Sequence, residues 1–126
     1  MLATIDERDT RPIYLQIMLQ IKEQIRDGRL KPGETLPSVR ELAEALGINL
    51  HTVRHAYDNL RQQGVVNFRL AQRAKVSARR ERPASREEIE RKLSPLVNEL
   101  ITDAFHLGMS DKELRQLLDE ALDAKK

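Results

Sequence analysis

The sequence predicts a mainly α-helical protein with one short β-hairpin, divided into an N-terminal domain and a C-terminal pair of helices. Apolar residues recur every three to four positions over most of the chain, which is the period of an amphipathic helix. This pattern is interrupted once, after Gly64, by two short stretches typical of strands. Because only four of the 126 residues are aromatic, we expect a core of aliphatic side chains, which suits packed helices.

Local start and stop signals define the first two predicted helices. The first begins at Pro12, a position where the missing N–H of proline costs nothing, and Gly28 fits its end. The second begins at Ser38, because Ser38 and Glu41 have the S-x-x-E spacing of a capping box. Gly47 ends this second helix, which is therefore short.

The third predicted helix begins with Asn49 as its N-cap and extends to Gln63. At about 100° per residue, its apolar residues cluster on one side. This side consists of Val53, Ala56, Tyr57 and Leu60. The opposite side carries His51, Arg54, His55 and Asp58.

A hairpin and a linker are predicted after the third helix. Residues 65–69 and 74–77 are expected to form two short strands around a turn at 70–73 that contains neither glycine nor asparagine. Residues 78–84 are polar and aperiodic, which indicates a linker. The N-terminal domain is therefore predicted to span residues 1–77, with its first ten residues as an extended arm.

Residues 85–126 are predicted to form a two-helix region. Capping boxes at Ser85 and Ser110 start its helices, and Pro95 is expected to kink or divide the first of them. Two amphipathic helices of this size cannot bury their apolar stripes completely against each other, so we expect a second copy of the chain to cover them. The alternative is that the stripe folds back on its own domain. The predicted dimerisation residues are Leu93, Leu96, Val97, Leu100, Ile101, Leu114, Leu117 and Leu118.

Charge is distributed unevenly along the chain, although the net charge is only +2. Residues 49–82 contain eight basic and two acidic side chains, whereas residues 83–126 contain seven basic and ten acidic ones. A basic segment of this kind indicates a surface that binds a polyanion. The absence of cysteine excludes disulfides, thiolate catalysis and cysteine-based zinc sites. No apolar run approaches the roughly 18 residues of a membrane span, so a cytoplasmic protein without a membrane partner is expected.

Three helices followed by a basic hairpin describe a winged helix-turn-helix, with the hairpin as the wing. The third helix can enter a major groove and present His51, Arg54 and His55 to base edges. The wing can follow the phosphates or reach the adjacent minor groove. Its cations are Arg69, Arg73 and Lys75. The expected partner is therefore double-stranded DNA.

The chain contains three characteristic motifs: Pro-Ile-Tyr-Leu-Gln-Ile at 12–17, Gly-Arg-Leu-Lys-Pro-Gly-Glu-Thr-Leu-Pro-Ser-Val-Arg-Glu-Leu-Ala at 28–43, and Thr-Val-Arg-His-Ala-Tyr at 52–57. Over residues 11–77 these motifs closely resemble the N-terminal domain of GntR-family bacterial transcription regulators. The tail, with Leu-Gly-Met-Ser at 107–110, looks like that of the YtrA-like subfamily, whose two C-terminal helices mediate dimerisation. The resemblance implies a homodimeric regulator, by analogy a repressor, that binds a palindromic operator.

The resemblance also assigns DNA contacts residue by residue. Arg40 on the second helix and Arg54 on the third match arginines that contact DNA in the family. Leu50 stands where many members have arginine, so we expect it either to contact a thymine methyl group or to pack in the core. The full predicted DNA-binding set is Arg40, Asn49, Leu50, His51, Thr52, Arg54, His55, Arg69, Arg73 and Lys75.

Other functions were weighed against DNA binding. A winged-helix module that has lost DNA binding and serves protein contacts is kept open by Leu50 and the glycine-free wing. An enzyme is not expected, because the chain has no nucleophile–base pair or phosphate-binding glycine loop. His51 and His55 have the spacing of two metal ligands on one helical turn, but no third ligand is evident, so no metal or cofactor is expected. The short tail leaves room for a small-molecule effector only at a dimer interface.

Overall fold

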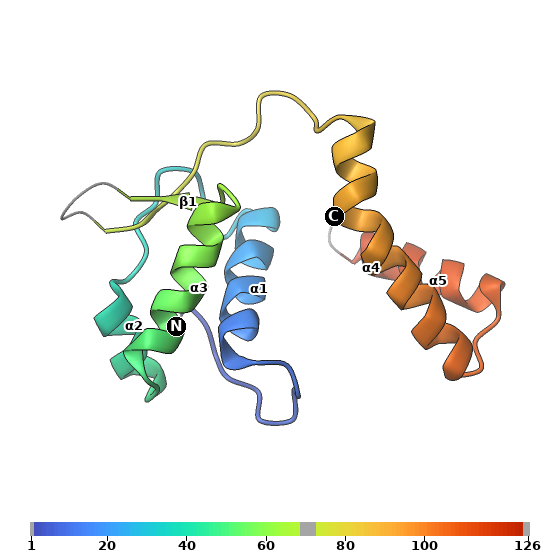
Figure 1. Cartoon of the computed structure of the whole chain (residues 1–126), viewed down its shortest axis with the longest axis horizontal. Helices are drawn as coiled ribbons and strands as arrows, with labels where there is room; N and C mark the ends of the chain where they lie inside the picture. The colour runs from blue at the N-terminus through green and yellow to red at the C-terminus, as the bar shows by residue number, and fades with distance from the viewer. Residues whose placement is uncertain (1, 69–72, 125–126) are drawn as a thin grey trace. The chain divides into compact units, whose positions relative to one another are not determined.

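The structure is a computed structural model that describes residues 2–68 and 73–124 (Figure 1). The chain forms two compact units, Met1–Arg79 and Arg80–Lys126. The predicted fold class is confirmed, since the described residues form five helices and one two-stranded antiparallel hairpin. No helix in the described part of the chain has both the length and the apolar character needed to cross a membrane.

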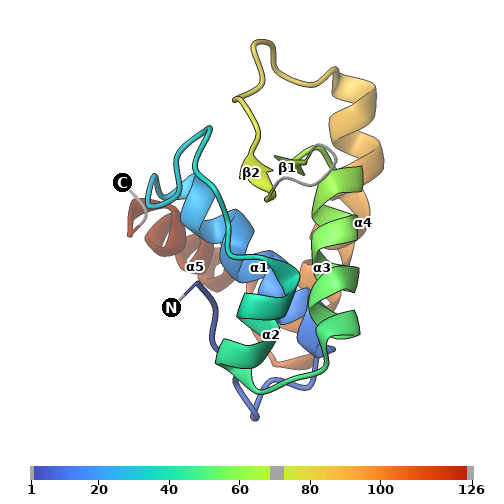
Figure 2. The ribbon, with the colours of Figure 1, turned by 90° about the vertical axis from the view of Figure 1, so that its left-hand side faces the viewer.

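The first unit contains three helices and the hairpin. The elements are α1 (Ile13–Arg26), α2 (Val39–Leu46), α3 (Leu50–Gln62), β1 (Val66–Asn67) and β2 (Lys75–Val76). Helix α3 packs against both α1 and α2, and the hairpin lies at its C-terminal end (Figure 2). The buried side chains are mainly aliphatic, as expected. They include Ile17, Ile21, Leu36, Leu42, Val53, Leu60, Val66 and Val76.

The predicted start and stop signals of α2 and α3 are confirmed. The N–H of Glu41 donates to Ser38 Oγ at 3.1 Å, and the N–H of Ser38 donates to Glu41 Oε1 at 3.0 Å, so both bonds of the capping box are present. Asn49 Oδ1 accepts from the N–H of His51 at 2.8 Å at the start of α3. Gly47 ends α2 with a φ of 68°, a left-handed conformation that favours glycine.

The prediction for the hairpin strands was too long. Only Val66 pairs with Val76 and Asn67 with Lys75, so each described strand has two residues instead of four or five. Arg69 and the rest of the predicted turn up to residue 72 lie outside the described residues.

The segment before α2 extends this small sheet on the other side of β2, which the sequence analysis did not predict. The N–H of Leu36 donates to the carbonyl of Ala74 at 2.8 Å. The N–H of Gly33 donates to the carbonyl of Val76 at 2.9 Å, and the N–H of Val76 donates to the backbone carbonyl of Glu34 at 2.9 Å. Because β2 has two edges, this pairing connects the wing directly to the loop between α1 and α2.

The N-terminal arm lies along α1 and is held there by three glutamines spaced one helical turn apart. Gln24 Nε2 donates to the carbonyl of Leu2 at 2.5 Å. Gln20 bonds both backbone groups of Thr4: its Oε1 accepts the N–H at 2.8 Å, and its Nε2 donates to the carbonyl at 2.5 Å. Gln16 Oε1 accepts the N–H of Asp6 at 3.0 Å. Between the first two of these groups, Ala3 is only 2% exposed. Residues 2–6 of the arm are extended, as predicted, but a turn at Glu7 and Arg8, where the N–H of Asp9 donates to the carbonyl of Asp6 at 3.1 Å, interrupts the extended chain. The arm also contributes to the packing of the domain.

The second unit consists of α4 (Arg86–His106) and α5 (Asp111–Asp123). Of the two effects expected of Pro95, a kink or a division of the first helix, the division does not occur, because α4 is continuous through Pro95. Pro95 cannot donate to the carbonyl of Arg91, but one missing bond in a helix of 21 residues leaves the remaining turns intact.

The predicted capping box at Ser85 was only half correct. Ser85 Oγ accepts from the N–H of Glu88 at 3.2 Å, but the carboxylate of Glu88 does not return to Ser85. Instead it forms ion pairs with Arg80 (3.4 Å) and Lys92 (3.7 Å), so two cations outweigh one backbone donor. The box at Ser110 is complete, with Glu113 as its acid.

The second unit leaves most of its large apolar side chains exposed. Among its described residues, only Ala104 is buried. Seven of the eight predicted dimerisation residues have exposed fractions of 37 to 60%, and Leu114 is half-buried. Helices α4 and α5 therefore form a unit whose apolar stripe is not covered by the unit itself.

Candidate nucleic-acid interface

Helix α3 presents a polar side to solvent, and its predicted buried face is confirmed. Val53, Ala56, Tyr57 and Leu60 are all at most 3% exposed. His51, Arg54 and His55 are exposed on the opposite side. The alternation follows from the 3.6-residue period of the helix, so one side can pack against α1 and α2 while the other remains available to a partner.

Tyr57 fixes α3 to the turn before α2. Its hydroxyl donates to the carbonyl of Pro37 at 2.7 Å, across the buried junction of the two helices. Burial raises the pKa of the Tyr57 hydroxyl, and the charge of Glu41 adds to this shift. The hydroxyl therefore stays protonated at neutral pH and remains a donor, which holds α3 in a constant orientation relative to α2.

His55 is less available than its position on the exposed side suggested. Its ring stacks on Tyr14 of α1, with the ring centroids 4.0 Å apart and the planes at 24°. The stacking leaves the ring edge, with its two nitrogens, as the part that can reach a partner. Sequence reasoning missed this contact because Tyr14 belongs to a helix whose packing against α3 has no local signal.

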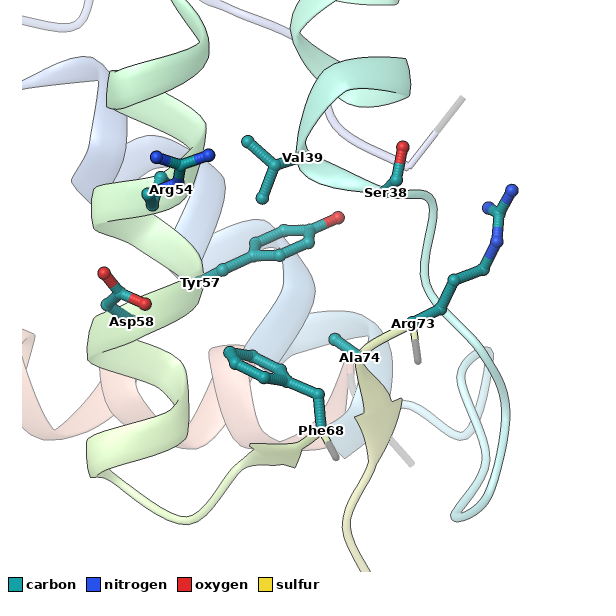
Figure 3. Close-up of a pocket in the computed structure, with 8 residues that line it drawn as sticks. All are labelled: Ser38, Val39, Arg54, Tyr57, Asp58, Phe68, Arg73 and Ala74. Atoms are coloured by element: carbon teal, nitrogen blue, oxygen red, sulfur yellow. The ribbon is translucent and has the colours of Figure 1, made fainter. Parts of the chain in front are cut away.

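A hollow of about 370 Å³ lies between α3, the start of α2 and the wing (Figure 3). Its lining combines apolar and charged side chains, namely Ser38, Val39, Arg54, Tyr57, Asp58, Phe68, Arg73 and Ala74. Arg54 of α3 and Arg73 of the wing stand on opposite sides of it, as Figure 3 shows. The arrangement places two guanidinium groups around one concave surface.

Arg73 is paired with an acid in this structure. Its guanidinium forms an ion pair with the carboxylate of Glu41, the acid of the α2 capping box. The hydrogen bond from the N–H of Ser38 and then the one from Arg73 lower the pKa of Glu41 to about 2. The pair was not predicted, because its two residues lie on different elements.

The start of the wing is fixed to α3 by a second contact. The guanidinium of Arg61 lies 5.2 Å from the centroid of the Phe68 ring, a cation–π distance. Phe68 is also half-buried and packs against the core, which agrees with its interpretation as a packing residue. Phe68, the last described residue before the wing tip, thus contacts α3, and Arg73, the first described residue after the tip, contacts α2.

The remaining predicted DNA-binding residues fall into two groups. Arg40 on α2 and Lys75 on β2 are exposed, and both belong to the same unit as Arg54. The residues around the start of α3 also serve the fold: Asn49 uses its side-chain oxygen as a cap, Leu50 is half-buried and packs against the core, and Thr52 is half-buried. The position of Leu50 favours its packing interpretation.

His51 and His55 are joined by no third metal-ligating residue in the part of the chain that the structure describes. Within residues 2–68 and 73–124, no group of three His, Asp or Glu residues is arranged to hold a metal ion.

Residues 13–78 match the profile of the family described as bacterial regulatory proteins, gntR family. The HTH-type transcriptional repressor YtrA of Bacillus subtilis (strain 168) is 34% identical over 119 residues, which is 92% of this chain and 88% of that protein. The HTH-type transcriptional repressor NagR of the same organism is 48% identical over 62 residues, but these make up only 26% of its length. The similarity to YtrA therefore includes the two-helix tail.

Solved structures agree with these similarities. A structure titled as a transcriptional antiterminator from Listeria monocytogenes EGD-e has a TM-score of 0.86 and 31% identity, covering 99% of this chain and 92% of that one. YtrA from Sulfolobus acidocaldarius, a GntR-family transcription factor, has a TM-score of 0.63 and 34% identity, covering 84% and 99%. The DNA-binding domain of AraR in complex with operator ORE1 has a TM-score of 0.52 and 25% identity, covering 61% and 94%. With its winged helix-turn-helix unit and short helical tail, this chain belongs to the GntR family of bacterial regulatory proteins, and it is similar to YtrA over nearly its full length.

Proposed function

We propose that this protein is a sequence-specific DNA-binding transcription regulator that acts as a homodimer on an inverted-repeat operator. The observation that carries the proposal is the exposed side of α3, where Arg54 projects from a helix whose other side is buried. In the AraR complexes, a DNA-binding domain that is 25% identical to this chain and similar to it in fold is bound to operator DNA.

The charges and positions of the side chains support separate roles within the interface. Arg54 is proposed to read a guanine through its O6 and N7 atoms, because a guanidinium can donate to both at once. Arg40, Arg73 and Lys75 are proposed to contact phosphates, as exposed cations on the flanking elements. Asn49, Leu50, His51, Thr52 and His55 complete the proposed surface on α3, and Arg69 completes it on the wing.

The uncovered stripe of the second unit supports the homodimer. We propose that residues 1–77 bind DNA, that residues 78–84 link the two parts, and that residues 85–126 pair with the same region of a second copy. Two α3 helices could then occupy major grooves one turn apart, which is the usual geometry of dimeric helix-turn-helix proteins.

The similarity to YtrA supports repression as the outcome of DNA binding, and a cytoplasmic location follows from a partner that is the chromosome. A small-molecule effector would find its most suitable place where the two copies meet, because the exposed apolar side chains of α4 and α5 would come together there. An enzymatic role is not proposed, since the relatives are named as regulators.

The test is selection of bound duplexes from a random pool, followed by affinity measurements over a range of salt concentrations. An inverted repeat should emerge, and Arg54→Ala should weaken binding to it by about 1–3 kcal/mol and relax one symmetric pair of positions. Lys75→Ala, the control, should weaken all sequences alike and flatten the salt dependence. Absence of salt-dependent duplex binding by the unmodified protein would favour a winged-helix module for protein contacts.

A further inference from the structure

One carboxylate beside the proposed DNA surface has two donors. Glu41 Oε1 accepts the N–H of Ser38 at 3.0 Å, and the same oxygen faces Nη1 of Arg73. The side chains of Arg73 and Glu41 are 51% and 52% exposed, so the Glu41–Arg73 pair is open to solvent and to a partner. The pair connects the start of α2 to the first described residue after the wing tip.

A carboxylate and a phosphate offer the same chemistry to a guanidinium. Both present oxygens that accept the parallel N–H bonds of the arginine fork. Nη1 of Arg73, which now faces Glu41, is therefore one of the groups that a DNA phosphate would need to bind both arms of the arginine fork. Because the pKa of Glu41 is held at about 2, its carboxylate is charged at any pH at which the protein would bind DNA.

We propose that Glu41 is an intramolecular competitor of DNA phosphate for Arg73, and that it limits the affinity of the protein for DNA of any sequence. For Arg73 to bind a phosphate, it must leave Glu41, whose negative charge then remains close to a polyanion. This inference rests on the proposed DNA-binding function and adds a regulatory residue to it.

The role proposed for Glu41 can be separated from its role as a cap. Glutamine also forms the capping box, because its side-chain oxygen can accept the N–H of Ser38. It carries no charge, so its hydrogen bond with Arg73 would be weaker than the charge-assisted one. Exposed ion pairs contribute little to stability, and we therefore expect Glu41→Gln to change DNA binding with only a small decrease in the melting temperature.

The experiment measures binding of the full-length protein to a labelled duplex of mixed sequence by fluorescence anisotropy at several salt concentrations. In the unmodified complex Arg73 is divided between Glu41 and a phosphate, so for Glu41→Gln the slope of log K against log salt should become steeper by up to about 0.9 for each Arg73. Each tenfold reduction in salt should then raise the affinity of Glu41→Gln relative to the unmodified protein by up to about eightfold for each Arg73 that gains a phosphate. Glu44→Gln is the matched control, since it removes the same charge from an exposed position of α2.

Arg73→Ala completes the comparison. In that background, Glu41→Gln should leave the slope unchanged, because no guanidinium remains to be released. Equal effects of Glu41→Gln and Glu44→Gln would overturn the proposal, and so would a steeper slope that persists without Arg73.

A second measurement needs no variant. Addition of the duplex to the unmodified protein should shift the carboxylate carbon resonance of Glu41 but not that of Glu113, which caps α5 without an arginine. An unshifted Glu41 would overturn the competition even if DNA is bound. An unmodified protein that does not bind the duplex at all would instead contradict the proposed function.

Discussion

The two units start their helices with the same signals but differ in how much apolar surface they bury. Ser38 with Glu41 and Ser110 with Glu113 form complete capping boxes, one in each unit. The first unit encloses side chains such as Ile17 and Leu60 at 0% exposure, whereas the second has only Ala104 buried among its described residues. Capping determines where a helix begins, but it does not provide the burial that keeps the helix folded. The first unit therefore has a closed core of its own, whereas the second leaves exposed the apolar stripe that we propose pairs with a second copy.

The largest expected effect comes from removing the second unit. A chain ending at Ala84 should remain folded, because its core lies within the first unit, but it should sediment as a monomer. It should bind an operator at least about 100-fold more weakly, since two half-sites are no longer engaged together. Sedimentation velocity, a melting curve and operator titration check these outcomes. A truncated protein that remained a tight dimer would show that the interface lies in the first unit.

Single leucine substitutions sharpen the comparison. Leu60→Ala in the first unit should lower the free energy of unfolding by about 2–5 kcal/mol, because it leaves a cavity in a closed core. Leu96→Ala, at a site 60% exposed within one chain, should instead raise the dissociation constant of the dimer. Denaturant titration measures the first effect, and sedimentation equilibrium over a dilution series measures the second.

Leu107→Ala is the control for this pair. Leu107 is 80% exposed and lies between α4 and α5, outside the predicted dimerisation set. Leu107→Ala should change neither the free energy of unfolding nor the dissociation constant of the dimer. If Leu107→Ala weakened the dimer as much as Leu96→Ala, the interface would extend beyond the predicted stripe.

The smallest expected effect is a difference in carboxyl pKa between Glu41 and Glu113, the acids of the two complete capping boxes. Hydrogen bonds from Ser38 and Arg73 lower the pKa of Glu41 to about 2, whereas hydrogen bonds from Ser110 alone lower that of Glu113. A lowered carboxyl pKa stabilises the fold above the ordinary value of 4.5, and this contribution is lost as pH falls toward the folded value. In carboxylate NMR titrations, Glu41 should titrate below Glu113, and Arg73→Ala should raise the pKa of Glu41. Identical titrations of the two acids would mean that Arg73 does not contact Glu41 in solution.

Features that depend on local sequence could be predicted, and features that depend on tertiary contacts could not. The capping box at Ser38 and the buried side of α3 follow from spacing alone, and both were predicted. The stacking of His55 on Tyr14 and the Glu41–Arg73 pair join separate elements, so no local pattern indicates them.

Two failures have a specific physical cause. Glu88 has the correct spacing for a capping box, but nearby cations compete for its carboxylate, and one of them lies outside the helix. The hairpin strands were predicted from their composition, whereas their length depends on pairing with the loop before α2. From the sequence, Leu50 fits either contact with a thymine methyl group or packing in the core, and its half-buried position against the core favours packing.

The glutamines of α1 and the arm residues that bond to them repeat at nearly equal distances along the two segments. Four residues of an α-helix rise about 6.0 Å, and two residues of an extended chain rise about 6.6 Å. Gln24, Gln20 and Gln16 can therefore meet every second residue of the arm, with a mismatch of roughly half an ångström at each step. Inserting one residue after Ala3 would turn the bonding backbone groups of the following arm residues away from the next glutamine. Inserting two residues would point these groups toward α1 again, with each of them moved to the next glutamine along the helix.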